Sequence, residues 1–318
     1  MFTTLALGSA RGANEMVIID HDGDADDFIA MTLVLRSRGH QVRAIAVCPA
    51  DSYLQPATRA TELILARLGA TGITIAEGHS SGTHPFPSTW RRYAGHVLTI
   101  PALLGVTAAA ANPLAPEDAA QVLAKLLAEG QTYTILETGP LTNIAGALKL
   151  DPAIKRNIRR IYVMGGAVRV AGNVQEKGYD GSAEWNIFNQ PMAADAVMRS
   201  GIPITLVPLD ATNKVPLARR FLDELGTQKS PASQIAEQAW RLAASQPGTD
   251  QYYFWDTLTA AVLLDPSVVT IEKLKIRVVT EGASEGRTVE DPKGSPVDVA
   301  VDAKQERVER LFLEVLRQ

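Results

Sequence analysis

The sequence predicts an α/β fold with an open, mostly parallel sheet and helices on both of its faces. Two observations support this prediction. Short aliphatic and β-branched runs alternate along the chain with longer segments of helical periodicity, which is the pattern of repeated βαβ units. Polar and glycine-containing turns follow several of the apolar runs, as they do where parallel strands end in ligand-binding loops.

Each expected element rests on one of these two patterns. The first helix begins with acidic residues, which suit the positive end of its dipole, and Gly39 is expected to close it. The expected strands are 16–20, 42–48, 73–76, 132–137, 159–164 and 203–208. The expected helices are 26–38, 56–68, 117–128, 141–149, 191–199, 231–245, 256–264 and 303–316. Three long segments rich in Gly, Pro and polar residues are expected to be functional loops, namely 78–97, 167–186 and 246–255.

The composition fits a globular protein with a full-sized core, since 46% of the 318 residues are hydrophobic. No linker divides the chain, so we expect residues 1–15 to form a flexible N-terminal extension and 16–318 to form a single domain. The formal net charge of −4 gives no basic excess for binding nucleic acid or a membrane surface. Cys48 is the only cysteine, which excludes an internal disulfide and a cysteine-based zinc site.

The chain is expected to be cytoplasmic and free of membrane contacts. No apolar stretch approaches the roughly 20 residues that a membrane-spanning helix needs. Residues 1–15 also lack the basic start and the long apolar stretch of a signal peptide.

Five aspartates crowd into eight residues between the first expected strand and the first expected helix: Asp20, Asp22, Asp24, Asp26 and Asp27. Such a cluster repels itself unless a cation occupies it, and a hard divalent ion held by oxygen ligands is the natural occupant. Adjacent helical residues point about 100° apart, so one of Asp26 and Asp27 can hold a metal while the other faces a substrate. The alternative is a helix N-cap with surplus surface acids.

Further polar groups follow the other expected strands and so fall at the same edge of the sheet. Asp51 follows the second strand, although it could equally form a turn or a helix cap. Asp210 is expected to end the sixth strand, and Asp256 opens an apolar helix that it could simply cap. The remaining groups lie in Thr138–Asn143, Met164–Gly166, Gly172–Asn173 and Glu184–Asn186.

Tryptophans in polar loops suit stacking on a flat ligand such as a nucleobase. Trp90 lies in one such loop, and Trp255 ends the aromatic run Tyr252–Trp255. Core packing is the alternative for each of them.

The segment 20–28 resembles the N-terminal signature of the nucleoside hydrolases, which cleave the N-glycosidic bond of ribonucleosides using calcium. The resemblance runs over most of the chain. Within that family the sequence is similar to the purine-specific branch, because Trp255 stands where the inosine–uridine branch usually has His. The segments that carry the resemblance are 138–143, 164–168, 172–174, 183–186 and 252–256, together with Pro85-Phe86-Pro87 followed by Trp90.

The resemblance implies a nucleoside hydrolase fold with a Rossmann-like core, and it assigns roles to individual residues. Calcium (Ca2+) would be held by the carboxylates of Asp22, Asp27 and Asp256 and by the Thr138 carbonyl, and Asp22 would also be the general base toward water. Trp90 and Trp255 would sandwich the purine, and Trp255 would count as catalytic by activating the leaving base. Asp51 would lie near the base or the attacking water, and Tyr252 in a loop that closes over the substrate. The other substrate-binding residues would be Asp26, Asn173, Glu184, Trp185 and Asn186.

The expected function is therefore calcium-dependent hydrolysis of purine ribonucleosides to ribose and free base, as in purine salvage. The resemblance is also compatible with a homodimer. Two departures stand out. No arginine lies in residues 245–251, just before Tyr252, where the purine branch commonly has one, and Gln190 stands where family members usually have Asp. A broad or inosine–uridine-preferring hydrolase is the alternative within the family. A metal-dependent phosphohydrolase and a non-catalytic nucleoside-binding protein are the alternatives from other classes.

Overall fold

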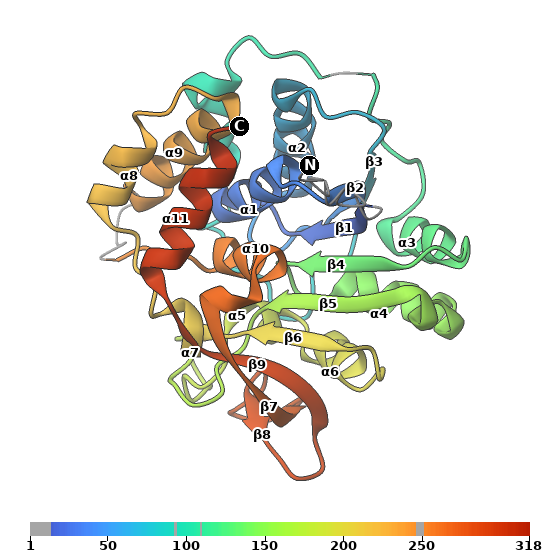
Figure 1. Ribbon diagram of the computed structural model, residues 1–318. Helices are drawn as coiled ribbons and strands as arrows, with labels where there is room; N and C mark the ends of the chain where they lie inside the picture. Colours follow the sequence, from blue (N-terminus) through green and yellow to red (C-terminus); the bar gives the residue numbers. More distant parts are fainter. Residues whose placement is uncertain (1–13, 92–93, 109, 246–250) are drawn as a thin grey trace, which may run out of the picture.

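A nine-stranded sheet forms the centre of the computed structural model, which describes residues 14–91, 94–108, 110–245 and 251–318 (Figure 1). The spatial order of the strands is β3-β2-β1-β4-β5-β6-β9-β7-β8. All neighbours from β3 to β9 are parallel, while β7 pairs antiparallel with β8 and β9. The strands are β1 Glu15–His21, β2 His40–Val47, β3 Thr74–Glu77, β4 Tyr133–Glu137, β5 Ile158–Met164, β6 Ile204–Val207, β7 Val269–Val278, β8 Thr288–Glu290 and β9 Ser295–Ala303.

Helices cover both faces of the sheet, as the α/β prediction requires. The helices are α1 Ala25–Arg36, α2 Leu54–Leu68, α3 Ala119–Ala128, α4 Thr142–Leu150, α5 Trp185–Asn189, α6 Pro191–Met198, α7 Leu209–Thr212, α8 Arg219–Leu225, α9 Pro231–Ala244, α10 Asp256–Leu264 and α11 Gln305–Leu316. Short 3₁₀ segments lie at Ala94–Thr99, Pro101–Leu103, Pro152–Asn157 and Pro266–Val268.

Strand β1 shows how the sequence separates the two layers, because successive side chains of a strand point to opposite faces. Val17 and Ile19 join the core formed with α1, α2, α9, α10 and α11. Ile18 lies between them in sequence and joins the opposite core, which contains residues of α3, α4 and α6. A strand buried on both faces reads as a continuous apolar run, and this is why β1 could be recognised from sequence.

All six expected strands and all eight expected helices are confirmed, with shifts of a few residues at their ends. Two local predictions are wrong. Helix α1 ends at Arg36 with Ser37 as its cap, so Gly39 lies beyond the cap. Asp210 lies within α7 rather than at the end of β6, and its buried carboxylate accepts hydrogen bonds from the amides of Val168 (2.9 Å) and Arg169 (2.8 Å).

The sequence does not predict the antiparallel part of the sheet, which β7, β8 and β9 form. Most side chains of β7 are exposed, and they include Glu272, Lys273, Lys275 and Arg277, so that segment has little of the apolar character of a buried strand. The predicted extension 1–15 falls outside the described residues except for Asn14 and Glu15, and Glu15 already belongs to β1.

Candidate active site

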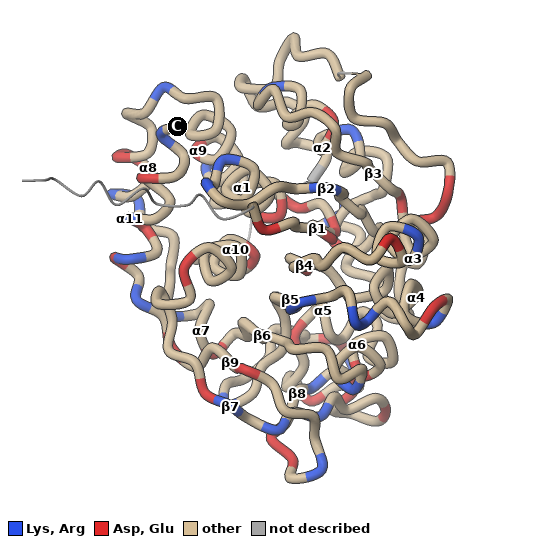
Figure 2. Tube along the Cα trace, turned by 45° about the vertical axis from the view of Figure 1, so that its right-hand side comes forward, with Lys and Arg blue, Asp and Glu red and all other residues tan. Residues whose placement is uncertain are grey.

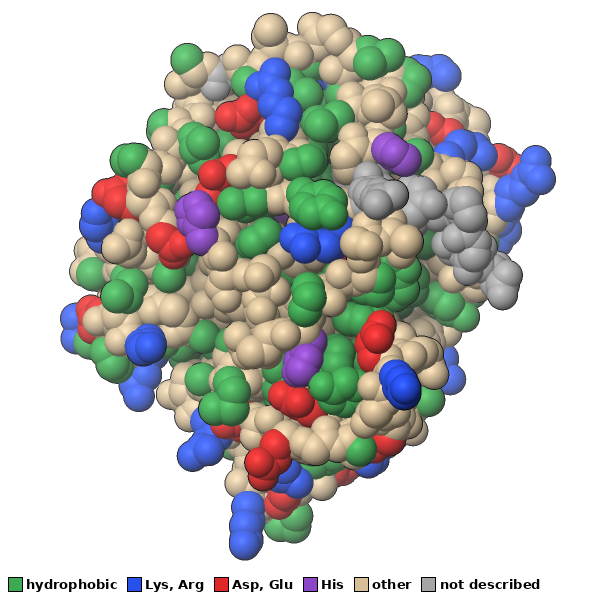
Figure 3. Space-filling model, turned by 180° about the vertical axis from the view of Figure 1, so that it is seen from behind, with side chains coloured by type: hydrophobic (Ala, Val, Ile, Leu, Met, Phe, Trp, Pro, Cys, Tyr) green, Lys and Arg blue, Asp and Glu red, His purple; other side chains and the backbone are tan. Residues whose placement is uncertain are grey.

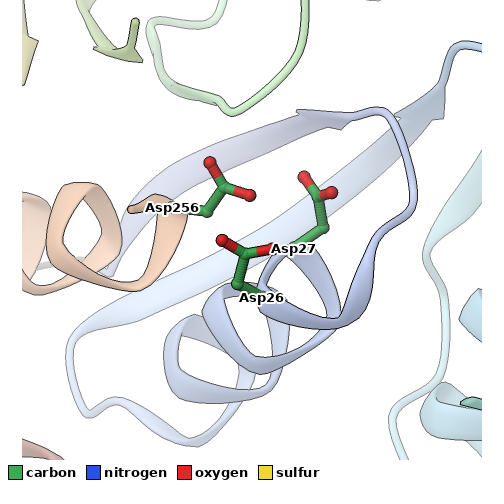
Figure 4. A group of neighbouring side chains, drawn as sticks. All are labelled: Asp26, Asp27 and Asp256. Atoms are coloured by element: carbon green, nitrogen blue, oxygen red, sulfur yellow. The ribbon is translucent and has the colours of Figure 1, made fainter. Parts of the chain in front are cut away.

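The predicted site residues gather at the carboxyl ends of the parallel strands, where α/β proteins bind ligands. Asp22 follows β1, Asp26 and Asp27 lie in the first turn of α1, and Asp256 begins α10. Figure 2 shows acidic positions close to one another where α1, β1 and α10 meet. Figure 4 shows the carboxylates of Asp26, Asp27 and Asp256 pointing toward one another, and one oxygen from each lies within 4.8 Å of the others.

Asp27 is the most firmly oriented of these carboxylates. Its Oδ2 accepts hydrogen bonds from the amides of Gly23 (3.0 Å) and Asp24 (2.8 Å), and its Oδ1 accepts one from the Thr138 hydroxyl (2.6 Å). Gly23 is needed in this turn because its φ is +88° and a Cβ would lie 2.4 Å from the Cβ of Ala57. The turn between β1 and α1 therefore fixes the direction of the Asp27 side chain before any ligand binds.

Burial and the neighbouring carboxylates raise the pKa of Asp22, Asp26 and Asp256. Burial, followed by the charges of Asp27 and Asp51, raises the pKa of Asp22 well above its usual value. Burial and neighbouring aspartates do the same to Asp26 and Asp256. Such a cluster costs free energy when ionised, and a cation in its midst removes that cost. Because every donor in the cluster is a carboxylate oxygen, the residues fit a hard ion such as calcium better than a soft one.

Thr138 lies against the same cluster, because its hydroxyl donates to Asp27 Oδ1. Asn186 Nδ2 donates hydrogen bonds to the carbonyls of Thr138 (3.1 Å) and Met164 (3.3 Å), so it joins the ends of β4 and β5. Asp51 approaches from β2, and its amide donates to Asp22 Oδ2 (3.3 Å). The structure thus brings Asp22, Asp27, Asp51, Thr138 and Asn186 together.

Glu184 and Asn173 hold the loop after β5 against α5. Glu184 accepts hydrogen bonds from the amides of Gly166 (2.8 Å), Asn186 (3.0 Å) and Ile187 (3.3 Å), and burial raises its pKa. Asn173 Oδ1 accepts a hydrogen bond from the Trp185 amide (3.1 Å). Both residues therefore have a structural partner in addition to the substrate role that the resemblance assigns to them.

Asp20 and Glu137 form a second pair of buried acids beneath the site. The sequence did not predict Glu137 as a site residue. Asp20 and Glu137 are opposite each other on β1 and β4 and are almost fully buried. Burial raises the pKa of Asp20 to about 7 and that of Glu137 well above its usual value. Asn143 donates to Asp20 Oδ1 (2.8 Å), and the Gly139 amide donates to Glu137 Oε1 (3.0 Å). The signal was present in sequence, since Glu137 is a charged residue that ends an otherwise apolar strand.

The predicted base-stacking tryptophans belong to two separate aromatic clusters. Trp90 is 42% exposed and meets Trp185 edge-on at 5.4 Å between ring centroids, while Trp185 itself is buried. Trp255 is half-buried and packs on Tyr252 at 4.7 Å and on a small apolar cluster of Met164, Ala167 and Leu209. The surface in Figure 3 shows apolar side chains exposed beside charged ones on the back of the molecule.

Tyr252 links the second aromatic cluster to the acids. It is buried, and burial followed by the charge of Asp26 raises the pKa of its hydroxyl well above the usual value. Residues 246–250 of the expected closing loop lie outside the described residues.

No helix in the described ranges is long and apolar enough to cross a membrane.

Comparison with known proteins shows the family to which this fold belongs. The sequence profile of a family described as "Inosine-uridine preferring nucleoside hydrolase" matches residues 17–310. An Arabidopsis thaliana protein named uridine nucleosidase 1 is 30% identical over 296 residues, which cover 90% of this chain and 85% of that protein. The crystal structure of an inosine-uridine preferring nucleoside hydrolase from Bacillus anthracis is 34% identical, with a TM-score of 0.88 and coverage of 95% of this chain and 99% of that one.

A purine-preferring ribonucleoside hydrolase from Gardnerella vaginalis is 25% identical, with a TM-score of 0.80 and coverage of 95% of this chain and 98% of that one. The similarity to these hydrolases extends over nearly the whole chain and sets aside a phosphohydrolase or a non-catalytic binding protein. The chain is an enzyme and belongs to the inosine-uridine preferring nucleoside hydrolase family.

Proposed function

We propose that this enzyme hydrolyses the N-glycosidic bond of ribonucleosides with the help of a bound calcium ion, and that purine nucleosides are its preferred substrates. The observation that carries the proposal is the buried group of carboxylates at the carboxyl edge of the sheet, with Asp27 already oriented by Gly23, Asp24 and Thr138. We take residues 16–318 to act as one domain in this reaction.

The proposed ligands are the carboxylates of Asp22, Asp27 and Asp256 and the carbonyl of Thr138. Asp26 lies in the same group as Asp27 and Asp256, so an ion held there would interact with its charge, and its proposed role is to bind a ribose hydroxyl. When bound, calcium supplies a positive charge that makes water easier to deprotonate.

Hydrolysis develops oxocarbenium-like charge on the ribose and negative charge on the departing base. Asp22 is the proposed base that removes a proton from the attacking water, and Asp51 is held beside it by the hydrogen bond to Oδ2. Asp26, Asn173, Glu184 and Asn186 are the proposed partners of the ribose hydroxyls, and Trp185 is a further proposed substrate-binding residue. Polar contacts to those hydroxyls lower the barrier when they strengthen in the transition state.

The purine preference rests on Trp90 and Trp255. Stacking on indole rings can raise the basicity of purine N7, so that a proton from solvent or from a relay reaches N7 and the base leaves in a protonated form. A pyrimidine has no N7 to protonate. Tyr252 lies between Trp255 and Asp26, where it can close the base end of the site.

The second candidate function is hydrolysis of a range of nucleosides that includes uridine. Its support is the similarity to an Arabidopsis thaliana protein named as a uridine nucleosidase and to a Bacillus anthracis enzyme described as inosine-uridine preferring.

Hydrolysis of inosine, adenosine, guanosine, uridine and cytidine, each with calcium and after chelation, tests both parts of the proposal. We expect calcium-dependent release of ribose, with higher kcat/KM for the purine nucleosides. Uridine turned over as fast as inosine would replace the purine preference with the second candidate. Full activity in verified absence of metal would overturn the calcium requirement.

A further inference from the structure

We propose that Arg91 is a positioning residue that ties the turn carrying Trp90 to the loop after β2, and that it thereby sets where the nucleobase lies relative to Asp22. The inference rests on the proposed function, because it takes Trp90 to be a surface on which the base stacks.

Arg91 makes three contacts with the loop after β2. Its Nη2 donates hydrogen bonds to the carbonyls of Pro49 (3.2 Å) and Ser52 (3.4 Å). Its guanidinium carbon lies 4.5 Å from the centre of the Tyr53 ring, within the range of a cation–π interaction. The two carbonyls flank Asp51, so one planar group holds both sides of the residue that bonds to Asp22.

The same loop is fixed on its other side to the turn after β1. The Ser52 amide donates to the Asp22 carbonyl (3.0 Å), and the Asp51 amide donates to Asp22 Oδ2 (3.3 Å). A Cβ added at Gly23 would lie 3.1 Å from the Cβ of Ser52, which shows how closely the two segments pack. The position of Asp22 and that of the loop after β2 are therefore coupled.

Trp90 is held by its own turn and by two edge-on ring contacts. The amides of Trp90 and Arg91 both donate to the Pro87 carbonyl, at 2.9 Å and 3.3 Å, which makes a single compact turn. The Trp90 ring is 42% exposed and touches Trp185 and Phe86 only at wide angles, 68° and 62° between ring planes. The guanidinium of the adjacent Arg91 connects this turn to the loop that bonds to Asp22.

Arginine suits this task better than lysine. A guanidinium is planar and can donate to carbonyls while it stacks on an aromatic ring, whereas a lysine ammonium keeps the charge without the fixed geometry. The hydrogen bonds of Arg91 go to backbone carbonyls and its ring contact is to Tyr53, so its proposed role is mainly geometric. Its charge also favours the ionised form of Asp51, against the effect of burial and the neighbouring aspartates on that pKa, and Arg91→Lys keeps this charge. A change of shape at constant charge should therefore act through Trp90.

The activity test is a double-mutant cycle on Arg91 and Trp90. We expect Arg91→Ala to lower kcat/KM for inosine by about 10- to 100-fold, comparable to the loss of one base stack in Trp90→Ala. Arg91→Lys should fall between Arg91→Ala and the wild type. The double variant should be little worse than Trp90→Ala alone, since the two residues would act as one unit. Arg59→Ala is the matched control, because Arg59 is an exposed arginine paired with Glu62 on the neighbouring helix α2.

Two kinetic outcomes would overturn the inference: Arg91→Ala within about threefold of Arg59→Ala, or a loss in the double variant equal to the product of the two single losses. If Arg91→Ala does not fold, as judged by circular dichroism, Arg91→Lys takes its place in the cycle.

A second measurement does not depend on activity. Hydrogen exchange at the amides of Trp90 and Arg91 in the ligand-free protein should quicken several-fold in Arg91→Ala and stay unchanged in Arg59→Ala. Unchanged exchange in Arg91→Ala would show that the guanidinium does not hold the turn. If the wild type cleaves no nucleoside, the proposed function fails by itself, and the exchange measurement still decides whether Arg91 ties the two segments.

Discussion

The hydroxyl of Thr138 donates a 2.6 Å hydrogen bond to Oδ1 of Asp27, and it thereby joins the end of β4 to the first turn of α1. Together with the amides of Gly23 and Asp24, this contact orients Asp27, a proposed calcium ligand, and the carbonyl of Thr138 itself is another proposed ligand. The two roles of Thr138, one for its backbone and one for its side chain, can be separated by substitution.

Thr138→Val should weaken calcium binding while leaving the carbonyl in place. Removing a hydrogen bond that orients a ligand typically costs 10–100-fold in metal affinity, so we expect a loss in about that range. Once the variant is saturated with calcium, kcat should return close to the wild-type value. Calorimetric titration with calcium measures the first effect and steady-state kinetics the second. Thr138→Ser keeps the hydroxyl and is the control, and equal affinity in all three proteins would contradict the prediction.

Asp22→Asn should lower kcat by about 10²–10⁴-fold, the usual contribution of a positioned general base. The amide cannot accept the proton, although it can still accept the hydrogen bond from Asp51. Because Asp22 is also a proposed ligand, the metal content of the variant must be measured alongside its kinetics. A variant with full metal content and a kcat within a few-fold of wild type would remove Asp22 as the base.

Trp255→Ala should lower kcat for inosine more than kcat for p-nitrophenyl riboside. An interaction that helps the base to leave contributes in the transition state, and a nitrophenolate is already a good leaving group. Steady-state kinetics on the two substrates measures the difference. Equal losses on both would mean that Trp255 positions the sugar or the loop and does not activate the purine.

Metal-free protein should be less stable at pH 8 than at pH 5. Burial raises the pKa of Asp20 from 3.8 to about 7 and that of Asp24 to about 6, so the folded state binds protons more tightly than the unfolded state. The resulting stabilisation is fully present below about pH 4 and is lost as the pH rises through 6 to 7. Thermal melts of chelated protein should therefore show a falling Tm over this window, and excess calcium should raise Tm most at pH 8. A Tm that does not fall between pH 5 and pH 8 would contradict this account.

The sequence was most informative where chemistry and burial coincide. β1 could be assigned because a strand that is buried on both faces has a continuous apolar pattern. The aspartates after it could be assigned because such a dense group of carboxylates is stable only with a cation. The exposed edge strand β7 could not be assigned in this way, since its charged residues are typical of a surface loop. Asp210 was misplaced for a related reason, because four residues of α7 are too few to show helical periodicity.

Contacts between loops that are distant in the chain could not be predicted from the sequence either. The chain order gave Asp22, Asp51 and Thr138 a common edge of the sheet, but it did not show that Arg91 bonds to the loop around Asp51. A guanidinium in a long polar loop looks like any exposed arginine until its acceptors are known.

The convergence of Asp26, Asp27 and Asp256 also has a consequence for how the enzyme is made. Asp26 and Asp27 lie near the start of the 318-residue sequence and Asp256 lies in its last quarter. A ribosome adds only about 5–20 residues per second. The first half of a nascent chain therefore emerges with its acidic turn exposed and without the third carboxylate. Contacts of such long sequence separation form slowly because closing a large loop costs chain entropy. Uptake of the ion would accordingly be a late event in biogenesis, and it would mark the chain as fully folded.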